Sequence, residues 1–400
     1  MDSENQQYAV DDEIATFFTK TSVTREACHS LAKELVGGGR VIPIAVQGAC
    51  SYTVYAGSDL SHVVQFRLKS LGLKGQTAAL ARRIFGTLAP DASFKQQLGD
   101  ESMAAAGQEP LLVYVMTRIR GISRLDFVLA HGFPENSPVN KVRRKTLIRD
   151  VASFFALAWK APQTVDKAYH NHLAETFENE LQILLIALPD RFHPVIRATL
   201  RALPSILALP MVLLHKDFGD CNIMVEEESC HLVGVIDWAE AEIGPFGINL
   251  HSLQDLMSKL HLKNGWIRYE DYDDLVACFW ETLDNELGGL DEDTTKAIKA
   301  ARVLGLLRSW AFTSRLANEP APVPIKDDES GRYRMMILEG LLLAPATRFE
   351  GLEKWIRVEG RDFEMRYEDW GGIELRLVYL SRPGQGLAYI IHFLVFGRHL

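Results

Sequence analysis

The spacing of apolar residues predicts a strand-rich first part of the chain and a helix-rich second part. Between residues 41 and 116, short apolar runs separated by turn residues predict strands at Val41–Val46, Tyr52–Ala56, Ser61–Leu68 and Leu111–Met116. An Ala-rich segment, Thr77–Leu88, has helical spacing. An amphipathic helix is expected before the first strand, between the cap-type residues at 21–24 and the three glycines at 37–39.

Helical spacing dominates after residue 119, with apolar residues at i, i+3 and i+4. It predicts helices at Asn140–Trp159, Ala174–Leu188, Ile196–Leu203 (ended by Pro204) and Thr294–Leu316. Short strands interrupt them at Met211–Leu214, Ile223–Val225 and Leu232–Ile236. The predicted fold class is therefore α+β, with a small β-rich N-terminal lobe and a larger, mainly helical C-terminal lobe. We divide the chain into a helical extension (1–37), the β-rich lobe (38–118), the helical lobe (119–345) and a tail of unknown role (346–400).

Composition excludes several classes of protein. The chain has 400 residues, is 47% hydrophobic and has a net charge of −9 with no basic cluster, so nucleic-acid binding is not expected. Its five cysteines are scattered, which favours reduced thiols over a disulfide framework or a zinc site. The N-terminus lacks the pattern of a signal or transit peptide, and the longest apolar run, Leu387–Phe396, is too short to span a membrane. We expect a cytoplasmic protein.

The segment Leu213–Trp238 carries the most informative chemistry. It contains His215, Asp217 and, five residues later, Asn222, followed by a predicted hairpin and Asp237. Phosphoryl transfer to a hydroxyl needs a carboxylate that orients the nucleophile and hard oxygen ligands for Mg²⁺. A hairpin can bring Asn222 and Asp237 onto one metal ion, while His215 would brace the loop backbone.

This pattern, His-x-Asp-x4-Asn followed by Ile-Asp-Trp, resembles the catalytic and metal-binding loops of the aminoglycoside phosphotransferase family, which are kinase-like small-molecule phosphotransferases. The order of the lobes also matches, so the resemblance covers roughly residues 40–345, and the whole chain more narrowly resembles fungal members. It implies a bilobed, protein-kinase-like fold and the use of ATP and Mg²⁺. It also implies that His215 and Asp217 belong to the catalytic loop and that Asn222 and Asp237 hold the metal.

In the N-terminal lobe the resemblance implies a nucleotide-binding set. Gly48 and Ser51 lie between two predicted strands, where a loop would cover the phosphates. Arg67 stands where the family has a lysine that contacts the α- and β-phosphates. Backbone groups near Met116 and Arg118 would meet the adenine edge. Each of these candidates has a structural alternative. The Gly48–Ser51 loop could be a plain hairpin, Arg67 a strand residue facing solvent, and the segment at Met116 and Arg118 a simple link between the lobes.

Two further positions depart from the family pattern, and three acids have more than one interpretation. The helix after Arg67 has no acid, with Thr77 near the expected place, and Asn249 replaces an acid that braces the catalytic loop. Glu240 and Glu242 either line a pocket for a cationic acceptor or form a solvated face. Asp220 is interpreted as a surface residue of the loop, and a contact with the metal or the substrate is the lesser alternative.

The sequence thus predicts an enzyme that transfers the γ-phosphate of ATP to a hydroxyl of a small molecule. Its expected partners are the nucleotide and the acceptor, with no nucleic acid and no membrane span. The alternative is a nucleotide-binding pseudokinase or scaffold with little or no catalysis, which the missing helix acid and Asn249 favour. The presence of Asp217, Asn222 and Asp237 favours the enzyme.

Overall fold

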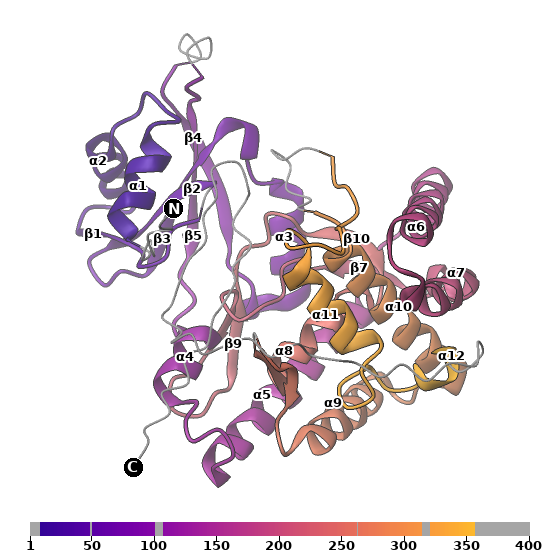
Figure 1. The fold of residues 1–400 in the computed structure, drawn as a ribbon. Helices are drawn as coiled ribbons and strands as arrows, with labels where there is room; N and C mark the ends of the chain where they lie inside the picture. Colours follow the sequence, from indigo (N-terminus) through magenta and orange to yellow (C-terminus); the bar gives the residue numbers. More distant parts are fainter. Residues whose placement is uncertain (1–8, 49, 101–106, 262, 314–320, 357–400) are drawn as a thin grey trace, which may run out of the picture. The chain divides into compact units, whose positions relative to one another are not determined.

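A computed structural model describes residues 9–48, 50–100, 107–261, 263–313 and 321–356 of the chain (Figure 1). The described residues form two compact units. The first unit contains the described residues up to Arg120, and the second contains those from Gly121 onward. The tail after residue 356, including the apolar run Leu387–Phe396, lies outside the described residues.

The first unit is built on an antiparallel sheet of five strands in the order β1-β2-β3-β5-β4 (Figure 1). The strands are β1 (Arg40–Pro43), β2 (Ser51–Gly57), β3 (His62–Leu68), β4 (Ala92–Leu98) and β5 (Leu111–Thr117). The helices are α1 (Val10–Phe18), α2 (Arg25–Leu35) and α3 (Gly75–Phe85), with short 3₁₀ turns at η1 (Lys69–Leu71) and η2 (Gly86–Leu88). Thr24 caps α2 as its sequence predicts, because its hydroxyl accepts from the N–H of Ala27 at 3.2 Å.

Alternation along β2 and β3 gives this sheet two different faces. Tyr52, Val54, Val64 and Phe66 are fully buried and join residues of α1 and α2 in one hydrophobic core. The intervening residues of the same strands point to the opposite face and are largely polar. The apolar face of the sheet therefore packs into the core of the unit. The opposite, polar face carries the candidate side chains of Ser51 and Arg67.

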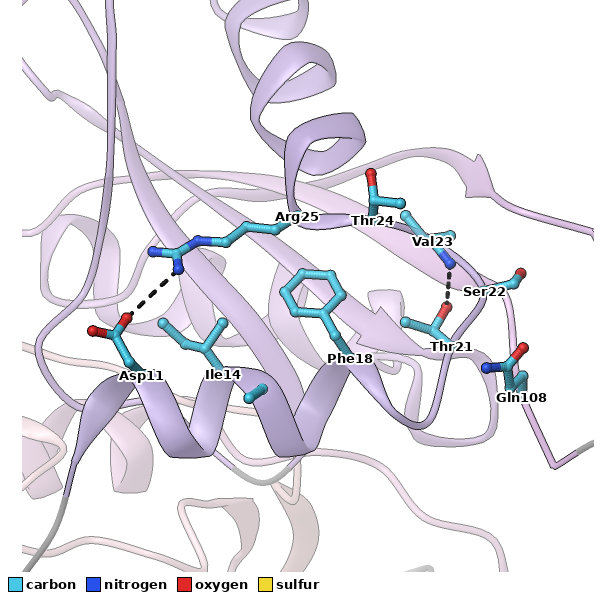
Figure 2. Close-up of a pocket in the computed structure, with 10 residues that line it drawn as sticks. Asp11, Ile14, Phe18, Thr21, Ser22, Val23, Thr24, Arg25 and Gln108 are labelled. Carbon is cyan, nitrogen blue, oxygen red and sulfur yellow. Dashed lines mark hydrogen bonds and ion pairs between the residues drawn. The ribbon is translucent and has the colours of Figure 1, made fainter.

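An open pocket of about 710 Å³ lies between α1 and the start of α2 (Figure 2). Ile14, Phe18 and Val23 give it an apolar lining, and Arg25 forms an ion pair with Asp11 at 3.5 Å across one end. The lining includes none of the residues that the sequence singles out for phosphoryl transfer.

The second unit is mainly helical (Figure 1). Its helices are α4 (Arg124–His131), α5 (Pro138–Lys160), α6 (Lys167–Ala187), α7 (His193–Leu207), α8 (Leu253–Met257), α9 (Tyr272–Leu287), α10 (Glu292–Trp310), α11 (Arg332–Leu342) and α12 (Glu353–Ile356), with 3₁₀ turns at η4 (Asp190–Phe192) and η5 (Ile248–Ser252). Its strands are β6 (Ile122–Ser123), β7 (Met211–Leu214), β8 (Ile223–Val225), β9 (Leu232–Val235), β10 (Glu242–Pro245), β11 (Ser258–His261) and β12 (Gly265–Arg268).

Short antiparallel ladders in this unit hold the loops of interest. β7 pairs with β10, and β8 lies between β6 and β9. The prediction that Pro204 ends its helix is wrong, because α7 continues to Leu207. The proline lies in the last turn, where the loss of one backbone hydrogen bond does little to stop the helix.

These elements confirm the predicted α+β fold class, with a β-rich N-terminal part and a mainly helical C-terminal part in the kinase-like order. Among the described residues, none of the helices combines the length and the apolar character that crossing a bilayer requires.

Candidate active site

The loop between β7 and β8 brings Asp217 and Asn222 into direct contact. The side-chain amide of Asn222 donates to both the backbone carbonyl and the carboxylate oxygen Oδ2 of Asp217, each at 2.8 Å. Phe218, next to Asp217, is buried against Phe154 and Phe155 of α5, at ring distances of 5.7 and 5.1 Å. This apolar anchor fixes the loop, while the neighbouring Asp217 stays exposed at its surface.

His215 links this loop to the strand that leads to Asp237. Its ring is buried, and Nε2 lies 2.8 Å from the carbonyl oxygen of Ile236, to which it donates. The ring also meets the indole of Trp238 edge-on at 4.8 Å. Its Nδ1 is buried with no hydrogen-bond partner among the described residues. His215 therefore acts as a brace between two segments, and its partner is the backbone of Ile236, the residue after β9, rather than the loop's own backbone.

Asp237 follows β9 with its backbone in the left-handed region, at φ 61°. Few residues other than glycine adopt this conformation, although aspartate and asparagine tolerate it better than most. The strand before it is held to the loop, because the N–H of Ile236 donates to the carbonyl of Asn222 at 2.9 Å. The hairpin therefore connects Asn222 and Asp237 as the sequence predicts, and Asp237 is exposed.

The electrostatic surroundings of Asp217 suit a proton acceptor. Partial removal from water raises the pKa of its carboxyl, and the nearby charge of Asp237 raises it further, while His215 and the amide of Asn222 act in the opposite direction. A carboxylate with a raised pKa is a better base toward a hydroxyl proton.

The donor set fits Mg²⁺, the metal that the sequence implies. Both amide hydrogen bonds of Asn222 use its nitrogen, so its carbonyl oxygen is left for a cation. Asp237 supplies a carboxylate. Protein Mg²⁺ sites commonly use one or two such ligands and complete the octahedron with waters and phosphate oxygens. Within the described part of the chain no cluster of three or more His, Cys, Asp or Glu side chains could hold a metal by itself.

The two acids proposed for a cationic acceptor differ in their surroundings. Glu242 in β10 lies 3.3 Å from the ammonium of Lys216 and 3.9 Å from the guanidinium of Arg308. These pairs reduce the negative charge that Glu242 could offer to a ligand. Glu240 is half-buried, and no ion pair is recorded for it within the described residues.

The interpretation of Asp220 as a surface residue is wrong. Its side chain is only 8% exposed and forms an ion pair with Arg124, which is 4% exposed. The two residues are 96 positions apart in the chain, so no local pattern could reveal their contact. Sequence analysis missed Arg124 altogether.

In the first unit, Ser51 and Arg67 share the polar face of the sheet as register partners in β2 and β3. Arg67 is buried and donates from Nε to the carbonyl of Leu71 at 2.6 Å and from NH1 to Gln65 at 3.3 Å. Gln65 in turn donates to the hydroxyl of Ser51 at 3.1 Å. The backbone carbonyl of Leu71 thus anchors Arg67 in place of the helix acid, which α3 lacks.

The remaining nucleotide candidates lie on the same unit. Gly48 belongs to a loop that Gln47 closes with hydrogen bonds to Ile44 and Thr53. Met116 lies in β5, where its register partners are Val63 in β3 and Ala92 in β4. The N–H of Arg118 donates to the carbonyl of Ser61 at 2.9 Å, so an adenine edge would have to use other backbone groups of this segment.

Asn249, the residue expected to brace the loop more weakly than an acid would, lies in η5. Asn249 is buried in η5, yet among the described residues its side chain has no recorded hydrogen bond to the loop. The loop depends instead on the contacts of Phe218, His215 and Asp220.

Comparison with known proteins identifies the family of this segment. The family model described as "Phosphotransferase enzyme family" matches residues 101–261, a range that includes the loop after β7 and Asp237. Residues 101–261 belong to the phosphotransferase enzyme family. The predicted family and enzyme class are therefore confirmed for this segment. None of the curated protein sequences matches the chain.

Several solved phosphotransferase structures are similar to the chain. The complex of gentamicin with APH(2")-IIa is 14% identical, covers 72% of this chain and 89% of its own, and has a TM-score of 0.42. APH(3'')-Id from Streptomyces rimosus is 12% identical, covers 71% and 99%, and has a TM-score of 0.39. A glucosamine kinase is 15% identical, covers 70% and 78%, and has a TM-score of 0.44.

Proposed function

We propose that this phosphotransferase transfers the γ-phosphate of ATP, in the presence of Mg²⁺, to a hydroxyl group of a small molecule. The observation that carries the proposal is the double hydrogen bond from Asn222 to Asp217, at 2.8 Å to each oxygen. It couples a candidate base to a candidate metal ligand within one loop of a phosphotransferase-family segment. The five cysteines are all free, which agrees with a reducing, cytoplasmic location.

In this mechanism Asp217 orients the acceptor hydroxyl and accepts its proton, while the attacking oxygen bonds to the γ-phosphorus and ADP leaves. Asn222 holds the Asp217 carboxylate in place and offers its carbonyl oxygen to the metal together with Asp237. Bound Mg²⁺ would neutralise charge on the phosphates. His215 positions these residues through the carbonyl of Ile236.

Arg67, Ser51 and Gly48 are proposed to contact the phosphates, and the Met116–Arg118 segment the base. The acceptor is a small hydroxyl compound, and Glu240 is the better candidate for recognising a positive charge on it, because Glu242 is already paired with Lys216 and Arg308.

Replacing Asp217 by alanine tests the proposal. We expect Asp217→Ala to lower kcat by at least about 10²–10⁴-fold, the range that general-base catalysis contributes, with nucleotide affinity nearly unchanged. The measurement is ADP formation over a panel of aminoglycosides, amino sugars and choline-type alcohols, with a thermal-shift titration of Mg²⁺ plus ATP. Asp190→Ala, at a fully exposed aspartate outside the loop, is the matched control.

Full turnover by Asp217→Ala would remove this residue from the mechanism. The absence of any thermal shift in the wild-type protein at millimolar nucleotide would contradict ATP binding itself. A shift without turnover on the whole panel would favour the second candidate, a nucleotide-binding scaffold. The acid-free α3 and the weak brace by Asn249 are the observations that favour it.

A further inference from the structure

A buried ion pair lies at the centre of the loop that carries the proposed catalytic residues. Asp220 stands between Asp217 and Asn222, and its carboxylate contacts the guanidinium of Arg124 at the start of α4. Both side chains are almost fully buried, so the contact is neither screened by solvent nor free to rearrange.

Further contacts attach the loop to the same segment of chain. The N–H of Leu125 donates to the backbone carbonyl of Asp220 at 3.0 Å. On the other side of Asn222, β6 pairs with β8 through Ile122 with Val225 and Ser123 with Met224. The segment 122–125 therefore holds the loop both before and after Asn222.

The placement of Arg124 is unfavourable for α4 alone. It occupies the first position of the helix, after the cap residue Ser123, where the positive end of the helix dipole disfavours a cation. Burying two charges also costs more than an apolar pair of similar volume would. Local stability therefore does not explain an arginine here, whereas fixing the position of Asp220 does.

We propose that Arg124 is a positioning residue that, through its ion pair with Asp220, holds the loop in the conformation in which Asn222 contacts Asp217. The proposal rests on the proposed function, because its consequence is a defined geometry for the base and the metal ligand. Arg124 touches neither the substrate nor the metal. It acts by restricting the backbone between the two residues that do.

The chain offers a matched control for this test. Arg144 and Asp271 form a second ion pair in the same unit, at 2.7 Å and with exposures of 12% and 8%, from helix α5 to the turn before α9. Replacing Asp271 by asparagine weakens a comparable buried pair without touching the loop.

We expect Asp220→Asn to lower kcat and to raise the half-saturating Mg²⁺ concentration by about 10–100-fold, the usual effect of losing a group that supports a metal ligand. At saturating Mg²⁺ the KM for ATP should stay within about twofold, because the nucleotide candidates lie in the first unit. Asp271→Asn should lower the melting temperature by a similar amount and leave kcat and the Mg²⁺ dependence unchanged. Arg124→Lys should recover part of the activity that Arg124→Met loses, since it retains the charge.

The affinity for Mn²⁺ gives a readout that does not depend on turnover. It is measured in the presence of ADP from the decrease in the EPR signal of free Mn²⁺. Asp220→Asn should weaken it and Asp271→Asn should not. If the wild type binds Mn²⁺ but phosphorylates no acceptor, the proposed function fails and the Mn²⁺ comparison still tests the ion pair. If the wild type turns over and Asp220→Asn behaves like Asp271→Asn in kinetics and metal binding, the positioning role is overturned. Should Asp220→Asn not fold, the same measurements on Arg124→Met decide, and wild-type kinetics and Mg²⁺ dependence of that variant would also overturn the proposal.

Discussion

At the scale of single residues, burial changes the roles of acids that look alike in the sequence. Asp217 and Asp237 are exposed and close enough to influence each other, whereas Asp220 is buried against Arg124. Fixed spacing within one short segment made His215, Asp217 and Asn222 recognisable. The Arg124–Asp220 contact joins residues 96 positions apart, so only the folded chain reveals it.

Asp255 in α8 shows the energetic consequence of such burial. Removal from water raises its pKa to about 7, repulsion from Asp220 adds to the rise, and Arg124 opposes it. Since an aspartate in the unfolded chain titrates near pH 4, the folded state binds the extra proton between about pH 4 and 7. The free energy of unfolding therefore falls as the pH rises through this window.

We predict that Asp255→Asn removes this pH-dependent decrease in the free energy of unfolding. The variant should gain at least about 1 kcal/mol relative to the wild type at pH 8, or about 2–4 °C in melting temperature, and nothing comparable at pH 4. Thermal unfolding at both pH values measures the difference, with the fully exposed Asp190→Asn as control. Equal differences at pH 4 and pH 8 would show that Asp255 does not titrate in this window.

At the scale of elements, apolar periodicity predicted the strands around the site closely. The predicted runs Met211–Leu214 and Ile223–Val225 coincide with β7 and β8. It missed β4, because this edge strand is mostly exposed and its sequence is largely polar. It also missed α1, whose acidic first turn resembles a solvated terminus although Ile14 and Phe17 are buried.

The packing of α10 against η5 is another feature that no periodicity reveals. A Cβ atom added to Gly305 in α10 would lie 1.7 Å from the carbonyl oxygen of Ile248. The glycine is therefore needed for this close approach, although alanine is the better helix former by about 1 kcal/mol.

We predict that Gly305→Ala destabilises the protein by about 2–5 kcal/mol, since the clash is with backbone and cannot be relieved by a rotamer change. The matched control is Gly75→Ala in α3, where nothing lies within 4 Å of the added methyl group, and it should be neutral or slightly stabilising. Chemical denaturation of both variants measures the difference. Equal stability of the two would show that η5 moves away without cost.

At the scale of the whole molecule, the candidate residues divide between the two units. The metal and base candidates belong to the second unit, and the phosphate candidates to the first. On the polar face of the sheet in the first unit, Arg67 is a buried cation that the carbonyl of Leu71 holds in place. Substitutions in the two units should therefore change different kinetic constants.

We predict that Arg67→Met raises the KM for ATP by about 10–100-fold, the loss expected for one hydrogen bond to a charged group, while the KM for the acceptor stays within about twofold. Arg67→Lys should recover most of the affinity, because an ammonium also binds phosphate as a point charge. Arg82→Met is the matched control: Arg82 lies in the same unit and also donates to backbone carbonyls, those of Gly86 and Ala89, but it is not a nucleotide candidate. Steady-state kinetics with each substrate varied in turn separates the constants. If Arg67→Met and Arg82→Met have the same KM for ATP, Arg67 is only a structural part of the sheet, and the phosphates must be bound by other groups.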